Sequence, residues 1–395
     1  MRVVISGGGT GGHIYPALAV ATQLRDKYNA DILYLGSDDG LEADLVPAAG
    51  FRMEVVKAGK LRRYISWSTF TGIGRVPVGM AQAVSIVGKF RPHVAFTSGG
   101  YVAVPAGLAA RLNGVPLLMH QQDVPPNLSN RIIGPLATRI SVTFADSMRY
   151  FPAHKTLHLG NPVRKEILDI CQITPQQARH ELGFAPELPL LLVTGGSQGA
   201  RYLNQVIVKT LPELLKVCQI LQISGNKLFA ETQMISDEVL ATIDATDRQH
   251  YRLVPYLSDE MPMALQAAEL VICRAGAATL SELAVLGKPS ILVPLPPAIG
   301  GSPQEVNAET FARKQAAEVM RNADLKPELL VERVKHITTS PACLLSMANA
   351  VRSLAKPTAT LDIVEAIVGI AKTKSMIVSP SVPTECDTIE GENNS

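Results

Sequence analysis

The sequence is poor in charged residues, aromatic residues and cysteine, and these shortages limit what the protein can be. Charged residues make up 18% of the 395 residues, aromatic residues make up 5%, and the formal net charge is +2. A chain this close to neutrality lacks the basic surface of a general nucleic-acid binder, so we expect no nucleic-acid partner. None of the five cysteines forms a C-x-x-C pair or stands at zinc-ligand spacing from a histidine. That pattern predicts free thiols in a reducing compartment.

Long hydrophobic runs are also missing. No run approaches the roughly 18 uninterrupted apolar residues that a membrane-spanning helix needs. The apolar stretch at residues 283–299 is interrupted by four prolines and a lysine. The first letters, MRVVISGGG, are typical of a buried strand that runs into glycines, and not of a signal peptide. We therefore expect a protein without a spanning helix, either soluble or peripheral to a membrane.

Short β-branched runs alternate with helix-length amphipathic segments along most of the chain. This alternation predicts an α/β protein built on doubly wound parallel sheets. The expected strands are residues 2–6, 31–35, 93–97 and 116–119, and then residues 188–194, 219–224, 251–254, 270–273 and 290–293.

The pattern restarts near residue 188, and the length also suits two domains. We expect Rossmann-like domains at residues 1–164 and 165–358, with ligands bound in the cleft beyond the carboxyl ends of the strands. Residues 359–373 predict an amphipathic helix that packs across the domain interface. Residues 374–395 are rich in Ser, Pro, Thr and acids, which predicts a disordered tail.

Three strand-to-helix junctions carry ligand-binding signals. Two are glycine loops, GGGTGGH at residues 7–13 and GGSQGA at residues 195–200. Each loop either cradles a phosphate on free N–H groups or is a tight turn that needs positive φ. The third junction, RAGAATLSE at residues 274–282, places Glu282 inside a helix. Its carboxylate either holds a ribose or simply favours the helix dipole.

Two other classes of protein stay open at this point. The first loop also matches G-x-G-x-x-G within residues 7–12, which favours a nicotinamide-dependent oxidoreductase. That interpretation leaves the second loop and the third junction unexplained. A non-catalytic UDP-sugar or lipid-binding protein is the other alternative, and the joint presence of His13, Glu282 and Gln304 argues against it.

In combination, the motifs resemble those of the MurG family. Members are peptidoglycan UDP-N-acetylglucosamine transferases that act on undecaprenyl-pyrophosphoryl-MurNAc-peptide. The resemblance covers residues 1–371 and implies a GT-B fold with inverting transfer from UDP-GlcNAc to that lipid acceptor. A transferase of the same fold with another lipid acceptor remains an alternative. The motifs are GGTGGHIYP at 8–16, GGY at 99–101, NPVR at 161–164, GGSQGARYLN at 195–204, RAGAATLSE at 274–282 and QEVNA at 304–308.

The resemblance also implies the site residues. Ser197 and Arg164 would contact the diphosphate, and Glu282 would hold the ribose. The acceptor would enter between residues 9–13 and Tyr101. The full set of implied substrate-binding residues is Thr10, Gly11, Gly12, Tyr101, Asp123, Asn130, Arg164, Ser197, Asn204, Leu257, Ser258, Arg274, Ala277, Ala278, Thr279, Glu282, Gln304 and Asn307.

His13 is the expected general base. It stands at a helix N-terminus, which disfavours the imidazolium and keeps the ring able to take a proton. The alternative is that His13 only hydrogen-bonds the loop or the donor. Helix N-termini and Arg164 would stabilise the departing diphosphate. The chain has no D-x-D motif, so we expect no fixed metal and no cofactor, although Mg²⁺ carried by the diphosphate is compatible.

The chain departs from the family pattern at residues 120–123 and at Pro303. The usual His-Glu-Gln-Asn is His-Gln-Gln-Asp here, so a carboxylate stands at Asp123 and not at Gln121. Because residues two apart in an extended chain point to one side, we expect Asp123 to supply its charge to the same part of the cleft and to share catalysis. Adding Gln121→Glu to Asp123→Asn would then restore activity. Alternatively, Asp123 caps the next helix.

Residues 57–80 mix lysines and arginines with aromatic and aliphatic residues. Such a mixture favours docking on anionic headgroups, so we expect peripheral binding at the cytoplasmic face of the cell membrane. An ordinary helix that packs its apolar face inward is the alternative.

Overall fold

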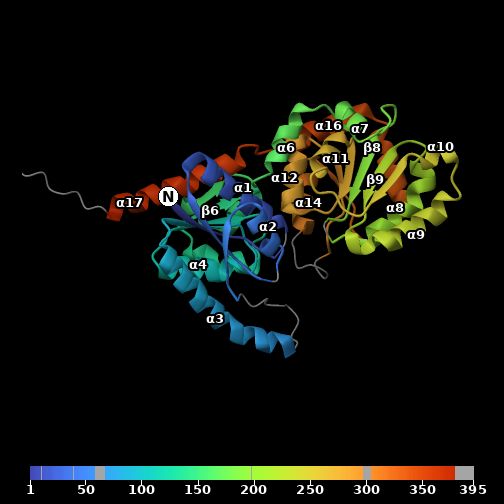
Figure 1. Ribbon diagram of the computed structural model, residues 1–395. Helices are drawn as coiled ribbons and strands as arrows, with labels where there is room; N and C mark the ends of the chain where they lie inside the picture. Colours follow the sequence, from blue (N-terminus) through green and yellow to red (C-terminus); the bar gives the residue numbers. More distant parts are fainter. Residues whose placement is uncertain (10, 39, 58–66, 197, 297–303, 379–395) are drawn as a thin grey trace, which may run out of the picture.

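The computed structural model describes residues 1–9, 11–38, 40–57, 67–196, 198–296 and 304–378, which form two α/β domains (Figure 1). The first sheet has seven strands in the order β3-β2-β1-β4-β5-β6-β7, and the second has six in the order β10-β9-β8-β11-β12-β13. The first sheet consists of β1 (Arg2–Ser6), β2 (Asp31–Gly36), β3 (Arg52–Val55), β4 (Val94–Thr97), β5 (Leu117–Gln121), β6 (Arg139–Val142) and β7 (Thr156–His158). The second consists of β8 (Leu190–Thr194), β9 (Gln219–Ile223), β10 (Tyr251–Val254), β11 (Leu270–Cys273), β12 (Ser290–Leu292) and β13 (Glu318–Val319).

Every strand pair is parallel, which confirms the predicted fold class. The central strands are short apolar runs buried on both faces, as parallel sheets covered by helices require. In each sheet the strand order reverses beside the first strand. The switch points therefore lie between β1 and β4 and between β8 and β11, where parallel sheets bind ligands.

Helices cover both faces of each sheet (Figure 1). Those of the first domain are α1 (Gly11–Tyr28), α2 (Glu42–Ala48), α3 (Trp67–Phe90), α4 (Ala103–Leu112) and α5 (Leu128–Ile133). Those that follow are α6 (Lys165–Asp169), α7 (Pro175–Glu181), α8 (Arg201–Leu214), α9 (Phe229–Leu240), α10 (Ala245–Arg248), α11 (Met261–Ala267), α12 (Ala277–Leu286), α14 (Gln304–Ala312), α15 (Pro327–Thr338) and α16 (Pro341–Arg352).

The last helix, α17 (Ala359–Val378), returns to the first domain (Figure 1). Ile363, Val364 and Ile367 are fully buried in the core of the first sheet. Glu365 accepts a hydrogen bond from Tyr28 at the end of α1. The helix extends to residue 378, so the first five residues of the expected disordered tail are helical. The prediction for residues 379–395 lies outside the described residues.

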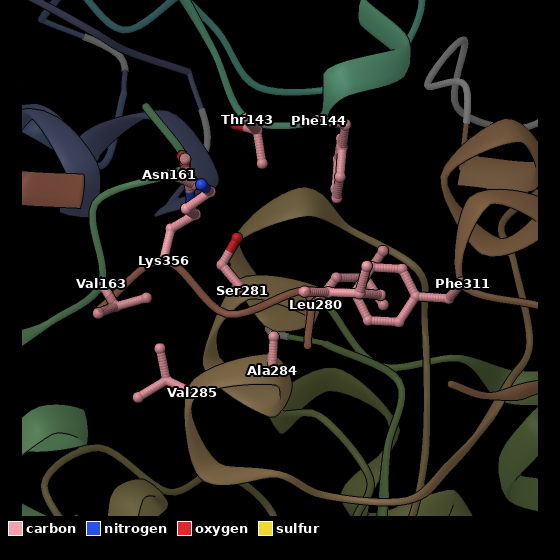
Figure 2. Close-up of a pocket in the computed structure, with 12 residues that line it drawn as sticks. Thr143, Phe144, Asn161, Val163, Leu280, Ser281, Ala284, Val285, Phe311 and Lys356 are labelled. Atoms are coloured by element: carbon pink, nitrogen blue, oxygen red, sulfur yellow. The ribbon is translucent and has the colours of Figure 1, made fainter. Parts of the chain in front are cut away.

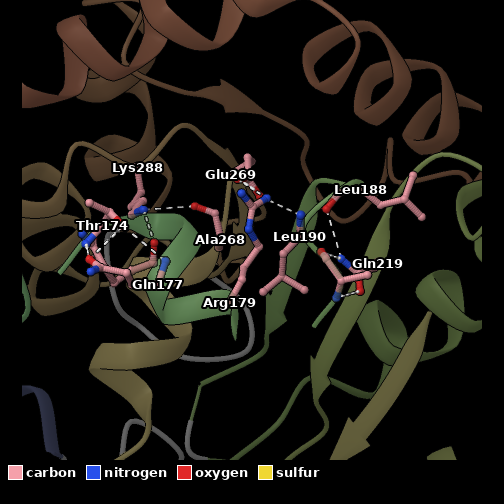
Figure 3. A network of polar contacts seen from close by, with 11 residues as sticks. Thr174, Gln177, Arg179, Leu188, Leu190, Gln219, Ala268, Glu269 and Lys288 are labelled. Atoms are coloured by element: carbon pink, nitrogen blue, oxygen red, sulfur yellow. Dashed lines mark hydrogen bonds and ion pairs between the residues drawn. The ribbon is translucent and has the colours of Figure 1, made fainter. Parts of the chain in front are cut away.

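A buried ion network braces the amino ends of strands in the second sheet (Figure 3). Arg179 pairs with Glu269 just before β11, and Lys288 just before β12 donates to the carbonyls of Gln266 and Ala268. Burial lowers the pKa of Lys288 to about 8. Because these groups hold one end of the strands, the loops at the other end project from a rigid base.

Candidate active site

The first switch point lies between β1 and β4, and α1, which begins just after β1, brings His13 to it. His13 Nδ1 lies 3.0 Å from the carbonyl oxygen of Ser98, and the Ser98 hydroxyl donates to the carbonyl of His13 at 2.6 Å. A carbonyl only accepts, so Nδ1 carries the proton and the lone pair of the neutral ring lies on Nε2. Burial lowers the pKa of His13, and the contact with Ser98 opposes this shift. The ring therefore has the tautomer and protonation state that a general base needs.

Asp123, in the loop after β5, places a negative charge close enough to His13 to affect its protonation. Its charge raises the pKa of His13 against the larger, lowering effect of burial. Burial raises the pKa of Asp123 itself, while a hydrogen bond from Asn307 and the charge of His13 lower it. Each group thus affects the protonation of the other, while a shared catalytic role stays a prediction.

Asn307 joins the two domains at this point. Its Nδ2 donates to Asp123 Oδ1 at 2.7 Å and to the carbonyl of Ala275 at 3.1 Å. Its Oδ1 accepts from the backbone N–H of Val124 at 2.9 Å. Asn307 is fully buried, so three hydrogen bonds fix one amide between the junction after β11 and the loop after β5. It therefore holds the Asp123 carboxylate in place, a role that its position in α14 did not reveal.

An ion pair spans the donor side of the cleft. Arg164 Nε donates to Glu282 Oε1 at 2.9 Å, and the Arg164 guanidinium lies 5.5 Å from the centre of the Tyr15 ring. Burial raises the pKa of Glu282, and Arg164 opposes that shift. Burial raises the pKa of the Tyr15 hydroxyl, and the nearby Tyr256 of the second domain adds to this shift. The predicted ribose and diphosphate ligands are thus adjacent, and two tyrosines that the sequence analysis missed line them.

The linker between the domains, residues 159–164, lies beside a small pocket (Figure 2). Asn161 and Val163 line the pocket from the linker, Leu280 from α12 and Phe311 from α14. His120 Nε2 donates to Asn161 Oδ1 at 3.0 Å, which ties β5 to the linker. Burial lowers the pKa of His120 to about 4, so this ring stays neutral. None of the residues that line this pocket belongs to the glycine loops, so we do not assign it to ligand binding.

Several predicted site residues make hydrogen bonds to loops of the second domain. Asn204 is buried and donates to Ser224, and Arg274 donates to the carbonyls of Val293 and Pro294. Gln304 accepts from the N–H of Leu295, beside the loop that ends β11. The remaining placements are Gly11, Gly12 and Tyr101 at the first loop, Leu257 and Ser258 after β10, and Ala277, Ala278 and Thr279 at the start of α12. Thr10 and Ser197 lie outside the described residues.

The side chains of Gln121 and Asp123 do not serve the same part of the cleft, which corrects the sequence prediction. Gln121 is fully buried, accepts from Asn130 Nδ2 at 2.8 Å and donates to the carbonyls of Asp123 and Pro125. Asn130 is likewise buried in this network. The loop bends after β5, so the rule for an extended chain does not apply there. Asn127, and not Asp123, caps α5.

Metal-ligand clusters and membrane-spanning helices are both absent from the described residues. Among them, no three His, Cys, Asp or Glu side chains gather in an arrangement that holds a metal ion. In the same part of the chain, no helix has the length and apolarity needed to cross a membrane.

Family matches over both domains identify a two-domain glycosyltransferase. Residues 3–142 match the glycosyltransferase family 28 N-terminal domain, and residues 190–363 match the family 28 C-terminal domain. Two relatives are UDP-N-acetylglucosamine--N-acetylmuramyl-(pentapeptide) pyrophosphoryl-undecaprenol N-acetylglucosamine transferases. The one from Caldanaerobacter subterraneus is 35% identical over 93% of this chain and 99% of its own, and the one from Desulforamulus reducens is 39% identical over 93% and 98%. The chain belongs to this family, the MurG family.

Solved structures agree with this assignment. The crystal structure of Acinetobacter baumannii MurG has a TM-score of 0.72 and 28% identity, over 93% of this chain and 99% of that one. A Neisseria meningitidis UDP-GlcNAc 2-epimerase shares the fold with a TM-score of 0.67 at 14% identity, over 93% and 100% of the two chains. The GT-B fold is confirmed, and the oxidoreductase alternative has no support.

Proposed function

We propose that this protein transfers N-acetylglucosamine from UDP-GlcNAc to the undecaprenyl-pyrophosphoryl-linked N-acetylmuramyl-peptide, a step of peptidoglycan synthesis. The observation that carries the proposal is the state of His13, whose Nδ1 donates to the Ser98 carbonyl and whose Nε2 is left to accept a proton. The Arg164–Glu282 pair supplies the donor-binding groups at the domain junction. A base on one domain and ribose and diphosphate ligands at the domain junction are what a single displacement on a nucleotide sugar needs.

In this reaction an acceptor hydroxyl attacks the anomeric carbon from the face opposite the diphosphate, so the configuration inverts. His13 Nε2 takes the hydroxyl proton as the new bond forms. The bond from the anomeric carbon to the diphosphate oxygen breaks, and UDP leaves with the electron pair. Arg164 stabilises the charge that develops on UDP. The proposal includes no protein-bound metal or cofactor.

A turnover assay with an acceptor panel tests this proposal. The purified protein is given radiolabelled UDP-GlcNAc with the lipid-linked muramyl-peptide or with lipid-linked sugars that lack the peptide or the N-acetylmuramyl group. We expect labelled lipid and free UDP in equal amounts with the first acceptor only. Equal turnover on another lipid acceptor would favour the alternative transferase, and UDP binding without turnover would favour a non-catalytic binder.

Replacing Glu282 with alanine is expected to weaken UDP binding without unfolding the protein. Loss of hydrogen bonds between a carboxylate and the ribose hydroxyls costs about 1.5–3 kcal/mol, which corresponds to a roughly 10- to 150-fold higher Kd. Titration calorimetry measures the Kd, and the melting temperature checks the fold. Glu238→Ala, an exposed glutamate on α9 of the same domain, is the matched control. An unchanged Kd would show that Glu282 serves only its ion pair with Arg164.

We also propose that the protein binds the anionic face of the cytoplasmic membrane through residues 57–80. Residues 58–66 lie outside the described residues, so the sequence alone carries this part. The wild type should float with vesicles of anionic phospholipid at low salt and dissociate at high salt, because counterions screen the attraction. The double variant Arg62→Glu/Arg63→Glu should float less, whereas Lys227→Glu/Lys326→Glu in the second domain should float like the wild type. Wild-type protein that stays with the pellet would refute the proposal.

A further inference from the structure

A carboxylate that the reaction does not use directly lies buried behind the first glycine loop. Glu42, the first residue of α2, is 0% exposed. Its Oε2 accepts from the backbone N–H of Gly9 at 3.1 Å. Its Oε1 accepts from the backbone N–H of Ser37 at 3.3 Å and from the Ser37 hydroxyl at 2.7 Å. Burial of a carboxylate is costly unless donors satisfy it, so these three hydrogen bonds are the reason that it can lie here.

The backbone around this carboxylate leaves room for it only because the neighbouring residues are glycines. A Cβ on Gly8 would meet Glu42 Oε1 at 2.5 Å, and a Cβ on Gly40 would meet Oε2 at 2.1 Å. A Cβ on Gly36 would meet the Glu42 side chain at 3.0 Å. Glycines from the first loop, the end of β2 and the turn before α2 therefore enclose one side chain, and this side chain links the first glycine loop to the end of β2.

The network continues to the acceptor side of the cleft. The Ser37 hydroxyl lies 2.5 Å from the Tyr101 hydroxyl. Ser37 has one hydroxyl proton, and the Glu42 carboxylate can only accept, so Ser37 donates to Glu42 and Tyr101 donates to Ser37. Any substrate group that binds the Tyr101 oxygen must therefore donate its own hydrogen, as a sugar hydroxyl or a peptide amide does. The Tyr101 ring also lies against Gly9, where a Cβ would meet it at 3.0 Å.

We propose that Glu42 is a positioning residue for the acceptor half of the cleft. Its carboxylate fixes Gly9, in the loop that leads to His13, and fixes the Tyr101 hydroxyl through Ser37. The base and the acceptor-binding tyrosine thereby keep one relative position. The inference rests on the proposed function, because it assigns Tyr101 to acceptor binding, and it adds that the contacted acceptor group is a hydrogen-bond donor.

Steady-state kinetics on full-length variants test the role. Glu42→Gln keeps the size of the side chain but turns an N–H₂ group toward one of the three donors. We expect kcat/KM for the acceptor to fall at least about tenfold, while the Kd for UDP stays within about twofold, because the donor is held mainly by the second domain. Glu54→Gln, a surface carboxylate paired with Arg52 on β3, is the control and should match the wild type.

A double-mutant cycle tests the path from Glu42 to Tyr101. Ser37→Ala and Tyr101→Phe should each lower kcat/KM for the acceptor about three- to tenfold, the effect of one hydrogen bond. The double variant should be no worse than Tyr101→Phe, because Ser37 acts on the acceptor only through the Tyr101 hydroxyl, which that variant already lacks. Strictly multiplicative losses would overturn the relay through Ser37.

Hydrogen–deuterium exchange separates failure of this inference from failure of the proposed function. In Glu42→Gln, uptake should rise in residues 7–13 and 98–101 and stay unchanged in residues 195–200. This readout needs no turnover, so it judges the positioning role even if the wild type proves inactive on the lipid acceptor. Wild-type uptake in both segments, or a fall in melting temperature with no change in acceptor KM or kcat, would show that Glu42 is merely structural.

Discussion

Replacing His13 with alanine is expected to lower kcat by about 10²–10⁴, the usual contribution of a general base. The Kd for UDP-GlcNAc should change little, because the groups assigned to the donor lie at Arg164 and Glu282, whereas His13 is fixed by Ser98. The reason is chemical: without Nε2, the acceptor proton passes to water as the hydroxyl attacks. Single-turnover kinetics with saturating acceptor measure the chemical step, and calorimetry measures donor binding.

His13→Asn separates catalysis from loop architecture. The asparagine amide can donate to the Ser98 carbonyl as Nδ1 does, but it cannot take a proton at neutral pH. We expect Asn to keep the wild-type melting temperature and to be as inactive as Ala. His336→Ala, at an exposed position in α15, is the control for loss of a histidine. Near-normal turnover in His13→Asn would mean that His13 serves only to hold the loop.

The sequence predicted the central strands because they are apolar runs buried on both faces. It missed β3, β6, β7 and β13, and for three of these, the edge strands β3, β7 and β13, the hydrophobic signal is weak. The burial of β3 and β13 is only partial, and β7 has three residues, so edge position and brevity remove the hydrophobic signal. Such segments become strands because they pair with a neighbouring strand of the sheet, as Arg52 of β3 pairs with Leu33 of β2. That information is tertiary and absent from local pattern.

The candidate site likewise contains residues that the sequence could predict and residues that it could not. The glycine loops, His13 and Glu282 were predictable because strand-to-helix junctions at a switch point have characteristic letters. The position of Asn307 between Asp123 and Val124 was not, because the contact joins residues about 184 apart in the chain. Glu42 was equally invisible, since an acid at the start of a helix has an ordinary dipole explanation. Only the three donors that converge on it give it another role.

Asp123 provides the second large effect. Asp123→Asn is expected to lower turnover about tenfold, the low end of general-base effects, with donor binding little changed. Asparagine keeps an oxygen that can accept from Asn307, so the domain contact survives and only the charge is lost. Asp123→Ala removes both and should cost more. Asp169→Asn, an exposed carboxylate on α6, controls for a charge change elsewhere.

The pH profile distinguishes a charge effect on His13 from a packing defect. In the wild type, burial lowers the pKa of His13 and the Asp123 carboxylate opposes that shift. A base works when deprotonated, so kcat/KM rises with pH through the pKa of His13. Removing the Asp123 charge destabilises the imidazolium, lowers that pKa further and moves the acidic limb to lower pH. The variant thus loses rate on the plateau but keeps its activity to lower pH.

Adding Gln121→Glu to Asp123→Asn gives the last test. The sequence alone predicted rescue, because the pair recreates the usual family order. The structure predicts none: Gln121 is fully buried and donates to the carbonyls of Asp123 and Pro125, which a carboxylate repels. We expect the double variant to be no more active than Asp123→Asn and to melt at a lower temperature. Restored turnover would contradict the separate placement of the Gln121 and Asp123 side chains, and an acidic limb that stays in place in Asp123→Asn would contradict a catalytic role for the Asp123 charge.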